Sequence, residues 1–289
     1  MSLRRRGVVH GILVVAVVAT SAMPALAETP LERGRYLMES IVACGNCHTP
    51  QGPKGPLPGM DLAGGLEIKE EAFTAYSANI TPDRKTGIGA WTDAQIITAI
   101  REGKRPDGSL IGPPMPFDMY RQMSDNDVKA IVAYLRTVKP VQNKPPKSDY
   151  RGLPLPPNWG PPVGHVADVP RDDPVVYGAY LAGPLGHCVE CHTPMVNGRF
   201  DFKNRIGAGG FKFYGPWGVS VSANITPHPE DGIGRYSDDE VRHMITAGER
   251  PDGSRLMPPM GVAYYAHISD EDLTAIIAYL RSLNPVASE

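Results

Sequence analysis

The chain has 289 residues, of which 42% are hydrophobic and 21% are charged, and its formal net charge at pH 7 is −2. This length and composition fit two globular domains of modest size. The slightly acidic balance argues against a role in binding nucleic acid. The chain has only four cysteines, so each of them can be considered individually.

The first 27 residues have the pattern of an export signal. Three arginines, Arg4 to Arg6, precede an apolar run that reaches about Ala22, and Ala25-Leu26-Ala27 supplies the small residues of a cleavage site. An uncleaved anchor helix is the alternative, although the apolar run is short for a bilayer. We predict general secretion and cleavage after residue 27. This would remove three of the 29 basic residues and none of the 31 acidic ones, and would leave a periplasmic protein without a membrane span.

Residues 28–139 predict a first, helical domain. A helix is expected from about Leu31 to Cys44, a second one from the capping box that begins at Thr92, and a third one from the cap residue Ser124. The apolar spacing in the third helix suits one buried face. No strand pairs are predicted, so the expected fold class is all-α.

Residues 140–172 form a proline-rich connector. Nine prolines between Lys139 and Asp173 predict an extended, semi-rigid segment. The segment could serve as a docking site for a proline-reading module. The simpler interpretation is that it packs over the two domains, with Trp159 as an anchor.

Residues 173–289 repeat the first domain. Gly34-Arg35-Tyr36-Leu37 matches Gly178-Ala179-Tyr180-Leu181, and residues 77–82 match residues 222–227. The offset is 144 residues up to the cysteines and 145 residues afterwards. Similarity over so long a period indicates duplication of a whole domain.

All four cysteines belong to two copies of one motif, Cys44-Gly45-Asn46-Cys47-His48 and Cys188-Val189-Glu190-Cys191-His192. Cysteines at i and i+3 of a helical turn point the same way, so both thiols can add to the vinyl groups of one porphyrin edge. The adjacent histidine then supplies an axial nitrogen to the iron. A zinc knuckle, a redox dithiol or a structural disulfide would not require that histidine in both copies. The sequence thus predicts two covalently bound haem c groups, with these cysteines as attachment sites and His48 and His192 as iron ligands.

Two methionines are the candidates for the second axial ligand. Met115 and Met260 each end a Pro-Pro-Met loop, ten residues after a repeated arginine, and lie 67 and 68 residues beyond their histidines. Met119 and Met257 lie nearby but have no methionine counterparts, so we expect packing roles for them. The alternative ligands are histidines of the second unit that lack a histidine counterpart in the first and are interpreted as surface or local polar residues: His187, His228, His243 and His267.

The motifs resemble those of class I cytochrome c domains in tandem. The shared sequence motifs are Cys-His-Thr-Pro, Ser-Ala-Asn-Ile-Thr-Pro, Gly-Ile-Gly, Pro-Pro-Met and Ala-Tyr-Leu-Arg. The chain is most similar to the multihaem cytochrome c subunits that accompany periplasmic alcohol, gluconate and sorbitol dehydrogenases and some molybdenum hydroxylases. Those subunits usually carry three haems, whereas this chain has two motifs.

The resemblance implies haem attachment at the four cysteines and His/Met ligation of both irons. It also implies that Gly34 and Gly178 let the first helix of each domain cross the last. It suggests contacts with haem propionates for polar residues that could equally be turn formers or solvated side chains. These residues are Asn79, Thr81, Asn224, Thr226, Arg105 and Arg250.

The expected function is that of a periplasmic dihaem electron carrier without substrate chemistry of its own. A dehydrogenase would be the electron donor, and an oxidase or another cytochrome would be the acceptor. The alternative is a dihaem enzyme, a peroxidase or a thiosulfate-oxidising cytochrome, with one displaceable ligand. Acidic runs at residues 238–240 and 270–272 could dock a basic partner or could cap helices.

Overall fold

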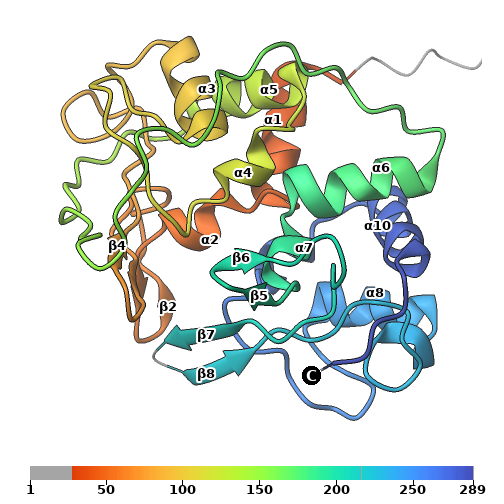
Figure 1. The fold of residues 1–289 in the computed structure, drawn as a ribbon. Coiled ribbons are helices and arrows are strands. Elements are labelled where there is room, and N and C mark those ends of the chain that lie inside the picture. The colour runs from red at the N-terminus through yellow and green to blue at the C-terminus, as the bar shows by residue number, and fades with distance from the viewer. Residues whose placement is uncertain (1–27, 216, 289) are drawn as a thin grey trace, which may run out of the picture.

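The computed structural model describes residues 28–215 and 217–288, so the predicted export signal lies outside the described residues (Figure 1). The two repeats have the same order of helices. The first contains α1 (Pro30–Glu39), α2 (Cys44–His48), α3 (Asp93–Glu102), α4 (Phe117–Tyr120) and α5 (Asp125–Leu135). The second contains α6 (Pro174–Tyr180), the π-helical segment η1 (Leu181–Leu185), α7 (Cys188–Cys191), the 3₁₀ turn η2 (Ile233–Arg235), α8 (Asp238–Ala247), α9 (Val262–Tyr265) and α10 (Asp270–Ser282).

The prediction that no strands pair is wrong. Four short antiparallel hairpins occur in the described part of the chain, two in each repeat. They are β1 (Gln51–Gly52) with β2 (Gly55–Pro56), β3 (Glu67–Lys69) with β4 (Thr74–Tyr76), β5 (Met195–Val196) with β6 (Arg199–Phe200), and β7 (Lys212–Gly215) with β8 (Gly218–Val221). Strands of two to four residues are too short to show a period-two pattern of hydrophobicity.

The first and last helices of each domain cross at a glycine, as predicted. A Cβ atom on Gly34 would lie 1.9 Å from the carbonyl oxygen of Ala130 in α5. A Cβ atom on Gly178 would lie 1.9 Å from the carbonyl oxygen of Ala275 in α10. Any side chain at these positions would push the helices apart, so the crossing requires glycine.

The helix starts are also confirmed. Thr92 and Gln95 form a reciprocal capping box at α3, and Ser237 and Glu240 form the equivalent box at α8. The Ser124 side chain accepts a hydrogen bond from Asp127 N at the start of α5. These caps satisfy backbone N–H groups that a helix cannot pair internally.

The two domains share one hydrophobic core. Buried residues from α1 and η1 belong to the same cluster, and Leu37 and Leu181 are both fully buried. A Cβ atom on Gly186 would lie only 2.7 Å from Cδ1 of Ile41, which shows how closely the backbone of the second domain approaches the first. Helix α4 contacts η1, and strand β3 contacts β7, so the domains meet at both of these places.

The connector packs on the first domain. Asp149 forms an isolated β-bridge with Thr74, and the hydroxyl of Tyr150 donates a hydrogen bond to the Pro113 carbonyl over 2.8 Å. The indole nitrogen of Trp159 donates to the Ile111 carbonyl over 2.9 Å, as expected for an anchor. The connector therefore fastens the backbone just before Met115.

Candidate functional site

The two Cys-x-x-Cys-His motifs form short helical turns, α2 and α7, which begin at unusual backbone conformations. Ala43 and His187, the residues before each first cysteine, have positive φ values of 48° and 40°. This left-handed geometry turns the chain sharply after the preceding helical segment. Each turn then places its two cysteines three residues apart on one helical face.

The thiols are partly accessible but lie in a desolvating environment. Cys47 is exposed, and the other three cysteines are partly buried; none of the four forms a disulfide. Burial raises the pKa of Cys44 to about 12 and that of Cys188 to about 11. Burial therefore favours the protonated thiol over the thiolate at the first cysteine of each motif.

The two motif histidines make the same hydrogen bond in both domains. His48 Nδ1 lies 2.7 Å from the Ala78 carbonyl oxygen, and His192 Nδ1 lies 2.7 Å from the Ala223 carbonyl oxygen. A carbonyl can only accept, so Nδ1 carries the proton and Nε2 keeps its lone pair. Burial lowers the pKa of both imidazoles, which favours the neutral form that binds a metal.

Met115 and Met260 lie in matched loops that follow cis peptide bonds at Pro113–Pro114 and Pro258–Pro259. Both methionines are partly buried, and Met115 packs against the core. The carbonyl of Pro258 accepts a hydrogen bond from Ser220 Oγ over 2.6 Å, at the position where Pro113 accepts one from Tyr150. Each loop is thus held by a hydrogen bond to the carbonyl of its first proline.

The competing methionines occupy different environments. Met119 is 8% exposed and belongs to the buried core, in agreement with the packing role expected for it. Met257 is 49% exposed. Neither environment is repeated in the other domain.

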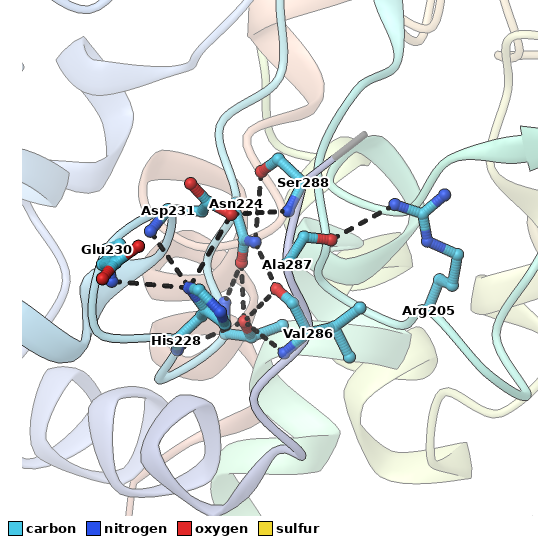
Figure 2. Close-up of polar contacts among 9 residues, drawn as sticks. Arg205, Asn224, His228, Glu230, Asp231, Val286, Ala287 and Ser288 are labelled. Carbon is cyan, nitrogen blue, oxygen red and sulfur yellow. Dashed lines mark hydrogen bonds and ion pairs between the residues drawn. The ribbon is translucent and has the colours of Figure 1, made fainter.

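Two of the histidine alternatives lie in different environments. His228 accepts backbone hydrogen bonds through Nδ1 from Glu230 and Asp231, so it is a local polar residue as expected (Figure 2). His187 differs from the expectation of a surface residue, because its ring meets that of Tyr120 edge-on at 6.0 Å between centroids. Burial lowers the pKa of His187 to about 4. Tyr120 and His187 come from different domains, and sequence spacing alone could not bring them together.

The asparagines and threonines suggested as propionate contacts form hydrogen bonds to the protein backbone. Asn224 Nδ2 donates to the Val286 carbonyl over 2.7 Å (Figure 2), and Asn79 Nδ2 donates to the Val141 carbonyl over 2.8 Å. Thr81 and Thr226 are fully buried and bond to the same two carbonyls. Their observed role is to fix the segment that follows the last helix of each domain.

The repeated arginines brace the methionine loops. Arg105 donates to the Leu110 carbonyl and Arg250 donates to the Arg255 carbonyl, so each arginine bonds within its own loop. The observed contacts therefore point to a structural role.

The first motif faces the second domain across the domain interface. The pKa of Cys191 is raised mainly by burial and further by the nearby groups Glu190, Cys188 and Cys47. Burial also raises the pKa of Tyr265 well above its usual value, with contributions from Cys188, Cys191 and Cys47. A side chain of the second domain is thus close to cysteines of both motifs.

Comparison with known proteins defines the class of the two domains. Residues 29–135 match the family model described as cytochrome c oxidase, cbb3-type, subunit III, and residues 177–284 match the one described as cytochrome c. The chain therefore consists of two cytochrome c domains in tandem. It is 31% identical over 250 residues to a dihaem c-type cytochrome of Cereibacter sphaeroides, with 82% of this chain and 81% of that protein covered. The chain belongs to the dihaem c-type cytochromes.

Cytochrome subunits of two dehydrogenases are also similar. The cytochrome c subunit of the alcohol dehydrogenase (quinone) of Gluconobacter oxydans is 35% identical over 296 residues, with 96% of this chain and 59% of that subunit covered. The cytochrome c subunit of the gluconate 2-dehydrogenase of Pantoea cypripedii is 31% identical over 299 residues, with 94% and 64% covered. The chain spans less than two thirds of the length of these two relatives.

Two haem c groups fit the residues that the structure provides. Each domain offers two protonated thiols on one helical turn and one neutral imidazole with a free Nε2. The protein binds two haem c groups, one in each domain. Residues 28–215 and 217–288 contain no group of three or more His, Cys, Asp or Glu side chains arranged to hold a bare metal ion. No helix among them is long and apolar enough to cross a membrane.

Proposed function

We propose that the protein is a periplasmic electron carrier that accepts electrons from a dehydrogenase and passes them to a respiratory acceptor, an oxidase or another cytochrome. The haems are attached through Cys44 and Cys47 in the first domain and through Cys188 and Cys191 in the second. The names of the similar subunits from Gluconobacter oxydans and Pantoea cypripedii support a dehydrogenase as the donor. The signal-like N-terminal sequence supports export.

The observation that carries this proposal is the repetition of both ligand environments. Each domain has a neutral histidine fixed through Nδ1 and a methionine in a loop held at the same proline carbonyl. His48 with Met115, and His192 with Met260, would fill both axial positions of each iron. When bound, each haem supplies one-electron redox chemistry, and a thioether ligand favours its ferrous state. Filled positions favour electron transfer over peroxidase chemistry.

Haem content and spin state test the ligation. The purified protein should contain two haems, both low-spin, with the weak near-infrared band of methionine bound to ferric iron. Met115→Ala and Met260→Ala should each remove the contribution of one haem. Met119→Leu is the matched control, because Met119 is buried in the same region and should leave the band unchanged. High-spin haem in the unaltered protein, or turnover with peroxide, would reject the carrier function.

The donor can be sought directly. Native purification from the periplasm should recover the cytochrome together with an oxidoreductase that reduces it. A protein that is absent from the periplasmic fraction would contradict the proposed location. A periplasmic protein that no dehydrogenase can reduce would contradict the proposed donor.

A further inference from the structure

The loop that carries Met260 is held by the haem-motif helix of the other domain. Asn46, at the second variable position of the first motif, donates through Nδ2 to the backbone carbonyl of Pro259 over 3.0 Å. Pro259 directly precedes Met260. A Cβ atom on Gly261, the residue directly after the methionine, would lie 3.6 Å from the same Nδ2 atom. The amide of Asn46 therefore bonds to the residue before Met260 and lies beside the residue after it.

A second contact fits the same helix to the same loop. A Cβ atom on Gly45 would lie 2.1 Å from the hydroxyl oxygen of Tyr264, so only glycine leaves room for this ring. In the repeat alignment, Val189 occupies the position of Gly45, and Met119 occupies the position of Tyr264. The contact between the glycine and the tyrosine ring is therefore not repeated between α7 and the Met115 loop.

The hydrogen bond has no counterpart on the other side of the interface. Glu190 occupies the position of Asn46 in α7, and in the described part of the chain it makes no hydrogen bond to the Pro114 carbonyl. The loop before Met115 is held instead by Tyr150 of the connector. The restraint from the opposite motif therefore acts on the Met260 loop alone.

We propose that Asn46 is a positioning residue for the sixth ligand of the second haem, so that the anchor of one haem restrains the methionine of the other. The inference rests on the proposed ligation by Met260. A donor at the Pro259 carbonyl limits movement of the next residue and keeps the thioether within reach of the iron. An added ligand that displaces Met260 must first release this loop. Loss of one neutral hydrogen bond should therefore favour displacement about threefold to tenfold.

The test follows displacement of methionine by imidazole in the full-length ferric protein. In a Met115→Ala background, the remaining near-infrared band reports the second haem alone. Adding Asn46→Ala there should lower the imidazole concentration at half-loss of the band by about threefold to tenfold. The midpoint potential of the second haem should also fall, because thioether ligation favours the ferrous state. In a Met260→Ala background, the band of the first haem should respond to imidazole as it does without the Asn46 substitution.

Three further variants make the outcome decisive. Asn46→Asp keeps the size of the side chain but has no amide proton, so it should act in the same direction as Asn46→Ala. Ser220→Ala removes the donor to the Pro258 carbonyl of the same loop and, as a positive control, should also lower the imidazole concentration at half-loss of the second haem's band. Asn126→Ala removes an asparagine in α5 that bonds to Asp168 in the connector, and it should change neither band.

Two results would count against the proposal in distinguishable ways. If Ser220→Ala lowers the imidazole concentration at half-loss of the second haem's band while both Asn46 variants leave that concentration unchanged, Asn46 does not position Met260. If the Met115→Ala protein has no near-infrared band at all, Met260 is not a ligand, and the proposed ligation itself is wrong.

Discussion

Tyr36 in the first domain donates its hydroxyl hydrogen to the carboxylate of Asp272 in the second, over 2.7 Å. Asp272 is 1% exposed, and no other side chain donates to its carboxylate within the described parts of the chain. The mirror contact, from Tyr180 to Asp127, is also 2.7 Å long, but Arg33 pairs with Asp127 as well. The two ends of the domain interface therefore depend on their tyrosines to different extents.

Phenylalanine substitutions should reveal this difference. Tyr36→Phe leaves a buried carboxylate without its side-chain donor, and we expect a loss of about 1.5–3 kcal/mol in the free energy of unfolding. Tyr180→Phe should cost about 0.5–1.5 kcal/mol, because Arg33 still pairs with Asp127. Urea denaturation of the dihaem protein, followed by circular dichroism, measures both losses. Equal losses would show that the arginine does not compensate.

Alkaline pH should weaken the same contact. Burial raises the pKa of Tyr36 to about 12, with the neighbouring Asp272 adding to the effect. A folded-state pKa above the unfolded value of about 10 gives stability that is fully present below pH ~10 and is lost as the pH rises through about 12. The stability difference between the unaltered protein and Tyr36→Phe should shrink over this range. A constant difference in urea midpoint from pH 9 to pH 12 would contradict the assignment.

The haem motifs, the methionine loops and the helix caps could be predicted because each depends on residues that are close together in the sequence. Cys44 to His48 lie on one turn, and Thr92 and Gln95 are three residues apart. The duplication also helped, because Met115 and Met260 occupy equivalent positions in the two repeats. The other methionines nearby have no methionine at the equivalent position. The glycine crossings followed from the resemblance and agree with the observed approach of the helices.

The domain interface could not be predicted, because it depends on how the two repeats pack together. Asn46 and Pro259 are separated by 213 residues, and Tyr36 and Asp272 by 236. One signal was present: Tyr36 matches Tyr180, and Asp127 matches Asp272 in the repeat alignment. Repetition of a tyrosine and a buried acid marks a shared role but does not show that the tyrosine of one repeat meets the acid of the other.

The glycine crossings give a prediction with an internal control. Gly34→Ala and Gly178→Ala would each place a methyl group 1.9 Å from a helix carbonyl oxygen, so the helices must separate. We expect each substitution to cost about 3 kcal/mol or more in stability, because the contact is with backbone that cannot move aside. Gly183→Ala meets no atom within 4 Å and should be neutral or slightly stabilising. Thermal denaturation of the three variants tests this, and a Gly34→Ala protein as stable as Gly183→Ala would refute it.

The acidic runs of the second domain are mostly engaged in local contacts. Glu240 accepts from Ser237 in the capping box of α8, and Asp238 pairs with Arg281 over 3.0 Å. In the second run, Asp270 pairs with Arg242 over 3.3 Å, and Asp272 is buried in the domain interface. These contacts favour helix capping over partner docking. Asp239 and Glu271 are exposed and make no ion pair in the described residues.

Asp239 and Glu271 therefore allow a docking role to be tested without disturbing a cap. Asp239→Asn combined with Glu271→Gln should leave the second-order rate of reduction by the proposed donor dehydrogenase within about twofold of that of the unaltered protein at ~0.1 M ionic strength, because exposed charges are screened over about 10 Å. Asp61→Asn with Glu71→Gln removes two exposed charges from the first domain and is the matched control. Stopped-flow measurements over a range of salt concentrations give the rates. A severalfold loss confined to the second-domain variant, with a weaker salt dependence, would show that the acidic runs steer the donor to the second haem.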